Sequence, residues 1–269
     1  MPTLDRQRAL ARQKLERQMA RRAAAAKRRR QLQAGTAAAL AVVVIIGGVT
    51  LLVLKLGSDD KPASNAAAPT PSAAASLPPG SCAYPKSSGG QVKNVGTPPT
   101  TKVAHAGTRT ATVKTSVGDL TFELDQAKAP CTANSFEFLA AKKYFDGTSC
   151  HRVTTSGIFV LQCGDPTGTG SGGPGYQYGE ENLPADPKTG YAKGVLAMAN
   201  AGSGTNGSQF FIVYKDGSGL DSKYSIFGKV TKGIEKVEEV AAAGVQGGGQ
   251  DGKPKKAVKI STVTLGPQT

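Results

Sequence analysis

Short apolar runs alternate with loops rich in Gly, Ser, Thr and Asn along residues 110–269. Apolar runs of this length, bounded by turn residues, are typical of β-strands. The pattern predicts eight strands, which cover residues 112–115, 119–124, 151–153, 159–162, 195–198, 210–213, 226–230 and 258–265. The first two are expected to form a β-hairpin, because the turn sequence Val117-Gly118-Asp119 lies between them.

Two segments of the same region have the composition of helices. Residues 132–142 follow Ala129-Pro130, and Pro is favoured in the first turn of a helix. The second helix is predicted between Lys232 and Ala243, in the sequence GIEKVEEVAAA. Many short strands with two helices indicate a strand-dominated fold, a closed or nearly closed antiparallel β-barrel whose ends the helices cover. The roughly 160 residues of this region are enough for one such core.

Two glycine-rich stretches are candidates for binding. The stretch over residues 194–213 places a polar, glycine-rich loop between two predicted strands, and glycine lets backbone groups approach an extended ligand closely. A connecting loop without a function is the alternative. Residues 164–175 superficially resemble a phosphate-binding loop but lack its Gly-Lys-Ser/Thr ending, so nucleotide binding is not expected. With two His in the chain, a Ser-His-Asp hydrolase is not expected either.

An uncharged apolar run covers residues 34–54, shortly after a segment rich in Lys and Arg. As a helix, its 21 residues are long enough to cross a hydrocarbon core of roughly 30 Å. The positive-inside rule then predicts a single-pass cell-membrane protein whose N-terminus is cytoplasmic and whose remaining chain is extracytoplasmic. A cleaved signal peptide is the alternative, since Ala66-Ala67-Ala68 faintly resembles a cleavage site. Signal-peptide apolar runs are shorter, however, at roughly 7 to 15 residues.

The composition also predicts how the chain is divided. Residues 57–109 are rich in Ala, Pro, Ser, Thr and Gly, with few large apolar side chains that could build a core. We therefore expect a linker there, with the region around Cys82 as one pinned point. The predicted segments are a basic cytoplasmic segment (1–33), a transmembrane helix (34–56), a Pro/Ala/Ser-rich linker (57–109) and a folded domain (110–269).

The formal net charge of +14 lies almost wholly in the N-terminal third of the chain. Residues 1–33 hold 11 Lys and Arg against 2 Asp and Glu, whereas residues 110–269 hold 16 against 15. The folded domain is therefore not expected to bind nucleic acid. A cytosolic protein whose basic arm binds nucleic acid is the alternative, and the apolar run over residues 34–54 argues against it.

The four cysteines form no C-x-x-C pair, so a zinc site is not expected. Outside the membrane, an even number of cysteines suggests disulfides. Cys150 and Cys163 lie on strands that we expect to be adjacent and are candidates for one bridge, which would leave Cys82 and Cys131 to pin the linker. The sequence leaves three connectivities open.

Several motifs follow one another along the predicted domain. They are FEL at 122–124, APCTANSF at 129–136, YFDGTSCHRV at 144–153, QCGD at 162–165, a glycine-rich run at 168–175, MANAG at 198–202, NGSQFF at 206–211 and FGKV at 227–230. Their order resembles that of the cyclophilins, a family of peptidyl-prolyl cis-trans isomerases, over roughly residues 110–267. The resemblance implies a closed eight-stranded antiparallel β-barrel capped by two α-helices. With the predicted anchor, it implies a membrane-anchored bacterial form of the family.

The resemblance also implies which residues form the site. Arg152 matches the catalytic arginine of the family. The residues expected to bind the substrate are Phe159, Val160, Gln162, Ala199, Asn200, Ala201, Gln209, Phe211, Leu220 and Tyr224. Among them, Phe159, Phe211 and Leu220 are expected to hold the proline ring. No cofactor and no metal ion is expected.

The chemistry of the reaction explains why these residue types are suitable. An X-Pro bond rotates slowly because amide resonance must be lost, with a barrier near 20 kcal/mol. In the twisted transition state the prolyl nitrogen becomes basic, so a guanidinium aimed at it stabilises that state more than either planar state. Arg152 is predicted to be this donor, because Arg keeps its charge, while Gln162 and the backbone of Asn200 hold the peptide on either side.

The predicted function is therefore prolyl isomerisation that assists the folding of proline-containing secreted or cell-envelope polypeptides. A cyclophilin-shaped binding module without useful turnover is the alternative. The family comparison also indicates departures: Gly219 stands where many members have Trp, Tyr224 where many have His, Val160 where Met is frequent, and Cys150 where Phe is frequent. The turn over residues 154–158 is about two residues longer than usual. Because that Trp contacts cyclosporin, a ligand of the family, we expect cyclosporin to bind this chain only weakly.

Overall fold

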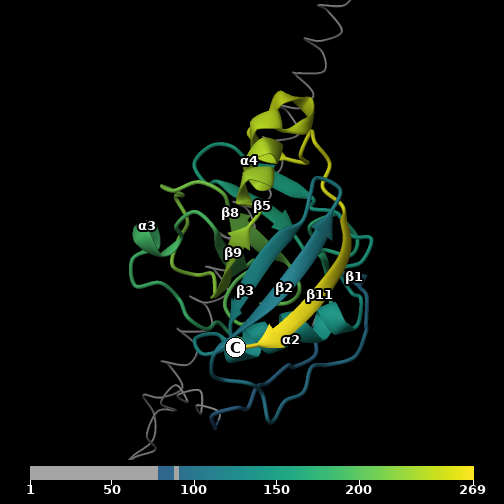
Figure 1. Cartoon of the computed structure of the whole chain (residues 1–269), viewed down its shortest axis with the longest axis vertical. Coiled ribbons are helices and arrows are strands. Elements are labelled where there is room, and N and C mark those ends of the chain that lie inside the picture. Colours follow the sequence, from purple (N-terminus) through teal and green to yellow (C-terminus); the bar gives the residue numbers. More distant parts are fainter. Residues whose placement is uncertain (1–77, 88–90) are drawn as a thin grey trace, which may run out of the picture. The chain divides into compact units, whose positions relative to one another are not determined.

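The computed structural model describes residues 78–87 and 91–269, which belong to one compact unit, Ala73–Thr269 (Figure 1). The predicted cytoplasmic segment and transmembrane helix lie outside the described residues, and so does the first part of the predicted linker. Within the two described ranges, no helix combines the length and the apolar character that crossing a membrane requires.

Nine strands form one antiparallel sheet. In the order of hydrogen-bonded neighbours they are β10 (Asp251–Gly252), β4 (Arg152–Thr154), β5 (Val160–Cys163), β8 (Phe210–Val213), β7 (Val195–Met198), β9 (Ile226–Lys232), β3 (Leu120–Asp125), β2 (Thr108–Thr115) and β11 (Ile260–Gln268). All eight predicted strands are present, and β7 and β8 have the bounds that their apolar runs predict. The predicted hairpin is formed by β2 and β3, with Val113 paired to Leu120 beside the turn.

The prediction of a closed eight-stranded barrel is wrong, because the strand order is open and ends at β10 and β11. The reason lies at the edge of β4, where the short strand β10 pairs with Val153 and Thr154. The segment before β4 meets β11 through an isolated bridge between Ser149 and Lys259, and the N–H of Cys150 donates a hydrogen bond to the carbonyl oxygen of Val258 at 2.9 Å. These contacts bring the two edges together without a continuous ladder.

Both predicted helices are present, α2 (Pro130–Ala141) and α4 (Ile234–Ala243), and they lie at opposite ends of the sheet in Figure 1. The first N–H groups of α2 are capped by the carboxylate of Glu181, which accepts hydrogen bonds from the backbone of Cys131 (3.1 Å) and Thr132 (2.8 Å). The sequence does not predict two short helices, α3 (Pro187–Gly190) and the 3₁₀ helix η1 (Gln246–Gly248).

Aromatic side chains form the centre of the main hydrophobic core. Phe136 of α2 packs against Phe122, Phe145, Phe210 and Phe227, with ring centroids 5.0 to 6.2 Å apart. All five side chains are buried. The buried side of α2 thus docks on the strands and fixes the helix against the sheet.

Residues 78–87 and 91–103, called the strap from here on, pack on the domain although their composition predicts a linker. Cys82, Tyr84 and Val103 are buried in the main core. The folded part therefore begins before residue 110, earlier than predicted. A few buried side chains, one disulfide and several backbone hydrogen bonds hold the strap, and backbone contacts leave little trace in composition.

The structure contains the disulfides Cys82–Cys131 and Cys150–Cys163. Of the three open connectivities, this is the one in which the two strand cysteines bridge each other. The first bridge ties the strap to α2, and the second joins the segment before β4 to the end of β5.

Candidate active site

The backbone register brings three predicted site residues into one row across β4, β5 and β8. Arg152 pairs with Gln162, and Gln162 pairs with Phe211. Residues directly opposite each other on antiparallel strands have neighbouring side chains on the same face of the sheet. The predicted catalytic, peptide-binding and proline-binding side chains therefore share one face.

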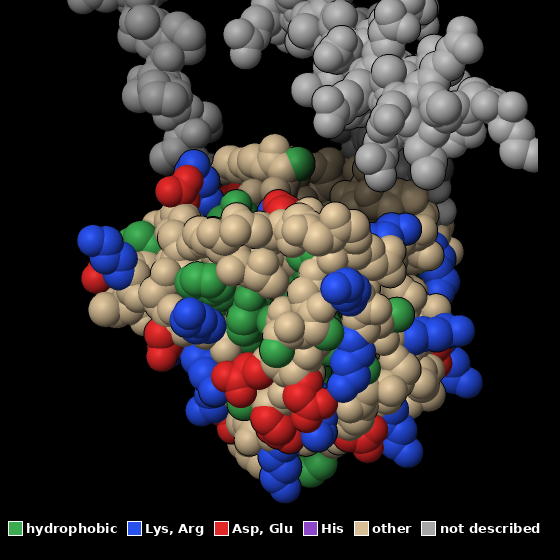
Figure 2. All heavy atoms as spheres, turned by 90° about the horizontal axis from the view of Figure 1, so that it is seen from above, with side chains coloured by type: hydrophobic (Ala, Val, Ile, Leu, Met, Phe, Trp, Pro, Cys, Tyr) green, Lys and Arg blue, Asp and Glu red, His purple; other side chains and the backbone are tan. Residues whose placement is uncertain are grey.

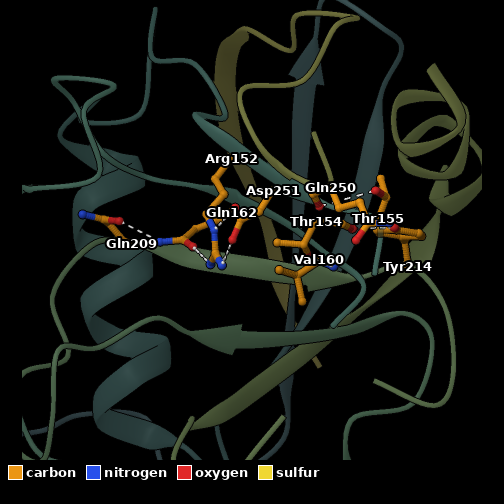
Figure 3. Close-up of polar contacts among 9 residues, drawn as sticks. All are labelled: Arg152, Thr154, Thr155, Val160, Gln162, Gln209, Tyr214, Gln250 and Asp251. Carbon is orange, nitrogen blue, oxygen red and sulfur yellow. Dashed lines mark hydrogen bonds and ion pairs between the residues drawn. The ribbon is translucent and has the colours of Figure 1, made fainter. Parts of the chain in front are cut away.

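The guanidinium of Arg152 is held from two sides (Figure 3). Its Nε and Nη2 donate hydrogen bonds to the two carboxylate oxygens of Asp251, each at 2.7 Å, and its Nη1 donates to Oε1 of Gln162 at 3.1 Å. A bidentate pair of this kind fixes the plane of the guanidinium. A guanidinium has five N–H groups, so these contacts leave one N–H on each Nη for a substrate.

The ion pair keeps both partners charged. The hydrogen bond from Arg152 lowers the pKa of Asp251, and the hydrogen bond to Asp251 raises the pKa of Arg152. Burial lowers the pKa of the neighbouring His151, although Asp165 opposes this effect, so the imidazole is neutral at neutral pH. Arg152 is therefore the cation of the row that it forms with Gln162 and Phe211.

A chain of amides continues from Arg152 to the glycine-rich loop. Nε2 of Gln162 donates a hydrogen bond to Oε1 of Gln209 at 2.9 Å, and Nε2 of Gln209 donates to the carbonyl oxygens of Gly170 and Gly172, both at 3.0 Å. Gln162 and Gln209 are thus engaged with each other, and Gln209 fixes the loop against the sheet.

The glycine-rich loop is built around the buried carboxylate of Asp165. Its oxygens accept hydrogen bonds from the backbone of Thr167 (2.7 Å) and Thr169 (2.9 Å). Burial alone would raise the pKa of Asp165, but the hydrogen bonds outweigh it and the pKa is lowered. A Cβ at Gly172 would lie 2.0 Å from Asp165 Oδ1, which explains why this position is a glycine.

A hollow of about 470 Å³ lies between this loop and the segment that follows β7. It is lined by residues 170–177 and by five predicted site residues, Gln162, Ala199, Asn200, Ala201 and Gln209. Asn200 uses its side chain within the protein, because its Nδ2 donates a hydrogen bond to the carbonyl oxygen of Lys223 at 2.8 Å. This arrangement fits the predicted role of its backbone in holding a peptide.

Beside the hollow lies a second apolar cluster, distinct from the main core. Its buried members include Val160, Phe211 and Leu220, and Tyr224 and Ala199 pack against them. The rings of Phe211 and Tyr224 meet edge to face at 5.3 Å. The structure thus brings together Phe211 and Leu220, two of the three residues predicted to hold the proline ring, and Phe211 lies in the same row as Arg152.

Phe159 does not belong to this cluster. Phe159 comes directly before β5, which begins at Val160, and its half-buried side chain is not among those packed against the second cluster. Instead, it packs against the main core, with its ring 6.1 Å from that of Tyr214 and with Lys215 Nζ 4.7 Å above it. The predicted role of Phe159 in holding the proline ring therefore stays a prediction, because Phe159 packs against the main core.

The sequence analysis missed Asp251, the carboxylate that holds Arg152. It lies 99 residues from Arg152, in the segment GVQGGGQDG, which has neither apolar periodicity nor a motif. The one available indication was a single acidic residue in a glycine-rich loop before the last strand, because functional residues often lie in loops. Ser87 of the strap, which also lines the hollow, was missed because the strap reads as a linker.

Charges of both signs are mixed over the face that lies at the α4 end of the molecule (Figure 2). A nucleic-acid-binding surface typically carries one sign. Among the residues that the structure describes, no group of three or more His, Cys, Asp or Glu side chains is arranged to hold a metal ion. The chemistry available at this site is that of the fixed guanidinium of Arg152, amide groups and an apolar cluster.

Residues 110–265 match the family model described as "Cyclophilin type peptidyl-prolyl cis-trans isomerase/CLD". The match covers more than half of the chain, and the chain belongs to this family.

Curated relatives and solved structures agree with this assignment. The "Probable peptidyl-prolyl cis-trans isomerase B" of Mycobacterium tuberculosis (strain H37Rv) is 46% identical over 197 residues, which cover 68% of this chain and 63% of the relative. The protein of the same description from Mycobacterium leprae is 42% identical, over 68% of this chain and 66% of the relative. The chain thus spans less than two thirds of the length of these relatives. A crystal structure of a cyclophilin type peptidyl-prolyl cis-trans isomerase from Cryptosporidium parvum superposes with a TM-score of 0.52 at 32% identity, covering 60% of this chain and 99% of that chain.

Proposed function

We propose that this protein accelerates cis-trans rotation about X-Pro bonds in polypeptides. One observation carries the proposal: a guanidinium fixed by Asp251 and Gln162 lies in the same strand row as the apolar residue Phe211. A proline ring seated against Phe211 and Leu220 has its nitrogen on the side of Arg152. When the amide twists, the nitrogen gains basicity, and the remaining N–H groups of Arg152 stabilise it.

The test uses the full chain and a peptide with a single X-Pro bond. We expect the protein to raise the rate of cis-trans exchange, measured by exchange NMR, at catalytic concentrations. Titration of the protein with the same peptide reports binding through changes in NMR chemical shifts. A chain that binds the peptide and leaves the exchange rate unchanged would be a binding module, and the proposed activity would be wrong.

We also propose that the protein is a membrane-anchored bacterial isomerase whose folded domain is extracytoplasmic and acts on proline-containing secreted or cell-envelope polypeptides. The uncharged run over residues 34–54 and the disulfides of the domain support this location, because disulfides persist in oxidising compartments. A second structure of the Cryptosporidium parvum isomerase, determined in the presence of the dipeptide Ala-Pro, supports the part of the proposal that concerns proline-containing substrates. Membrane fractionation of intact cells, followed by protease treatment from outside, tests the location; recovery in the soluble cytosolic fraction would contradict it.

Weak binding of cyclosporin is a further expected result, now with a structural reason. A Cβ at Gly219 would lie 3.0 Å from the carbonyl oxygen of Gly157, to which the N–H of Gly219 donates a hydrogen bond at 2.8 Å. The long turn over residues 154–158 thus closes against the position where many family members have Trp. We expect inhibition at least about tenfold weaker than for a Trp-bearing homologue, the size of one lost contact in a pocket. Inhibition curves of both proteins with one substrate check this, and equal potency would contradict it.

A further inference from the structure

The strap runs beside the glycine-rich wall of the hollow, residues 172–175. Backbone hydrogen bonds join the two segments: Ser87 N–H to Gly175 O (2.9 Å), Gln177 N–H to Pro85 O (2.9 Å) and Lys93 N–H to Gly173 O (3.1 Å). In addition, β1 (Gln91–Val92) pairs in parallel with β6 (Gly172–Gly173). The wall of the hollow is therefore one strand of a small sheet whose other strand belongs to the strap.

The strap itself is anchored to α2. Cys82 is bonded to Cys131 of α2, and the hydroxyl of Tyr84 donates a hydrogen bond to the carbonyl oxygen of Cys131 at 2.7 Å. The same hydroxyl accepts a hydrogen bond from Nδ2 of Asn134 at 2.8 Å, and the Tyr84 ring lies 5.4 Å from that of Tyr176. These contacts connect α2, the strap and the wall of the hollow in one series.

The wall needs such support because of its composition. Residues 172, 173 and 175 are glycines, which lose more conformational freedom on ordering than any other residue and bring no side chain for packing. The strap supplies the backbone partners that hold these glycines in place. It also contributes Ser87 directly to the lining of the hollow, and the described residues of that lining include no charged side chain.

We infer that the strap determines part of the substrate specificity of the hollow. It holds the glycine wall at a fixed distance from Asn200 and Gln209, and with Ser87 it limits the size of an uncharged substrate side chain that flanks the proline. The inference rests on the proposed function only in that the hollow binds part of a proline-containing peptide. It assigns a role in substrate choice to a segment outside the residues that match the family model.

A bulky residue at Ser87 tests the inference directly. Full-length wild type and Ser87→Phe are compared on peptides in which the residue before or after the proline is Gly, Ala, Leu or Phe. We expect Ser87→Phe to lower kcat/KM for Leu or Phe peptides about tenfold relative to the Gly peptide, since a filled pocket rejects the larger group. Ala83→Phe is the matched control, because Ala83 is an exposed strap residue outside the hollow lining, and it should leave all ratios unchanged. An equal loss on all peptides, or the same shift with Ala83→Phe, would overturn the inference.

Release of the strap provides the second test. The double variant Cys82→Ala, Cys131→Ala removes its covalent anchor, and amide hydrogen exchange at Ser87 and Gln177 reports whether the strap has left the wall. We expect faster exchange there together with a changed preference among the peptides; faster exchange with an unchanged preference would refute the inference. Dissociation constants for the same peptides, from NMR titration, are measured in parallel. A further outcome is that neither the wild type nor the variants accelerate cis-trans exchange of the X-Pro bond while Ser87→Phe still changes which peptides bind. In that case the proposed activity fails and the role of the strap stands.

Discussion

Replacing Arg152 by Ala is expected to lower kcat/KM for prolyl isomerisation by about 10²- to 10³-fold, the usual cost of removing one donor that stabilises transition-state charge. Arg152 is the cation in the row that contains Gln162 and Phe211. Without it, nothing in that row stabilises the basic prolyl nitrogen, while the apolar cluster still binds the ring. We therefore expect the loss in kcat, with KM nearly unchanged, as measured by exchange NMR over a range of peptide concentrations.

Folding must be separated from catalysis in this experiment. The side chains of Arg152 and Asp251 are 35% and 56% exposed, so breaking their ion pair should cost at most about 1 kcal/mol of folding stability. Thermal unfolding of the variant should be close to that of the wild type. The matched control is Arg152→Lys, which keeps the charge but loses the planar, bidentate geometry, and it should recover only part of the rate. A full rate in Arg152→Ala with intact folding would contradict the proposed mechanism.

The parts of the site that could be predicted are those whose signals are local. The bounds of β7 and β8 follow from two four-residue apolar runs between glycine-rich loops. Arg152, Gln162 and Phe211 each lie in a dense motif that fixes their place relative to a strand. Local patterns of this kind survive in the fold because short strands are defined by their own residues and turns.

The parts that could not be predicted depend on how distant segments meet. Asp251 reaches Arg152 only because two residues of a glycine-rich loop pair with β4, and nothing in that loop encodes the pairing. The same pairing explains why the sheet does not close as expected. The packing of Phe159 could not be predicted for a different reason: a motif match names a residue, but the neighbours of its side chain depend on how the segment before β5 meets Tyr214 and Lys215.

Removing Asp251 is expected to give the second-largest effect, a fall in kcat of about tenfold for Asp251→Ala, because a poorly oriented donor loses part of its transition-state stabilisation. Two effects of Asp251 compete. Its two hydrogen bonds of 2.7 Å fix the plane of the guanidinium, whereas its negative charge weakens the field of Arg152 at the prolyl nitrogen. Because the carboxylate is more than half exposed, water screens the charge, and we expect orientation to dominate.

The variant Asp251→Asn separates these two effects. The substitution removes the charge, whereas the side-chain oxygen of Asn can still accept one hydrogen bond from Arg152. If orientation dominates, we expect a rate between those of Asp251→Ala and the wild type. If the charge dominates, we expect a rate above that of the wild type. The pKa of Asp251 is lowered by Arg152, so the ion pair is present above the ordinary pKa of Asp and is lost only as the pH falls through the lowered value. The ratio of wild-type to Asp251→Ala rates should therefore be constant around neutral pH and shrink only in strong acid.

A double-mutant cycle distinguishes a positioning residue from one that supports the fold in general. If Asp251 acts through Arg152, then Asp251→Ala should change the rate little in a protein that already carries Arg152→Ala. Because the two side chains are in direct contact, strong non-additivity is the expected result. An additive loss would mean that Asp251 contributes through another route, such as the position of β10 at the edge of β4. The N–H of Thr155 donates a hydrogen bond to the carbonyl oxygen of Gln250 at 2.8 Å. Amide hydrogen exchange at Thr155 would then be faster in Asp251→Ala than in the wild type.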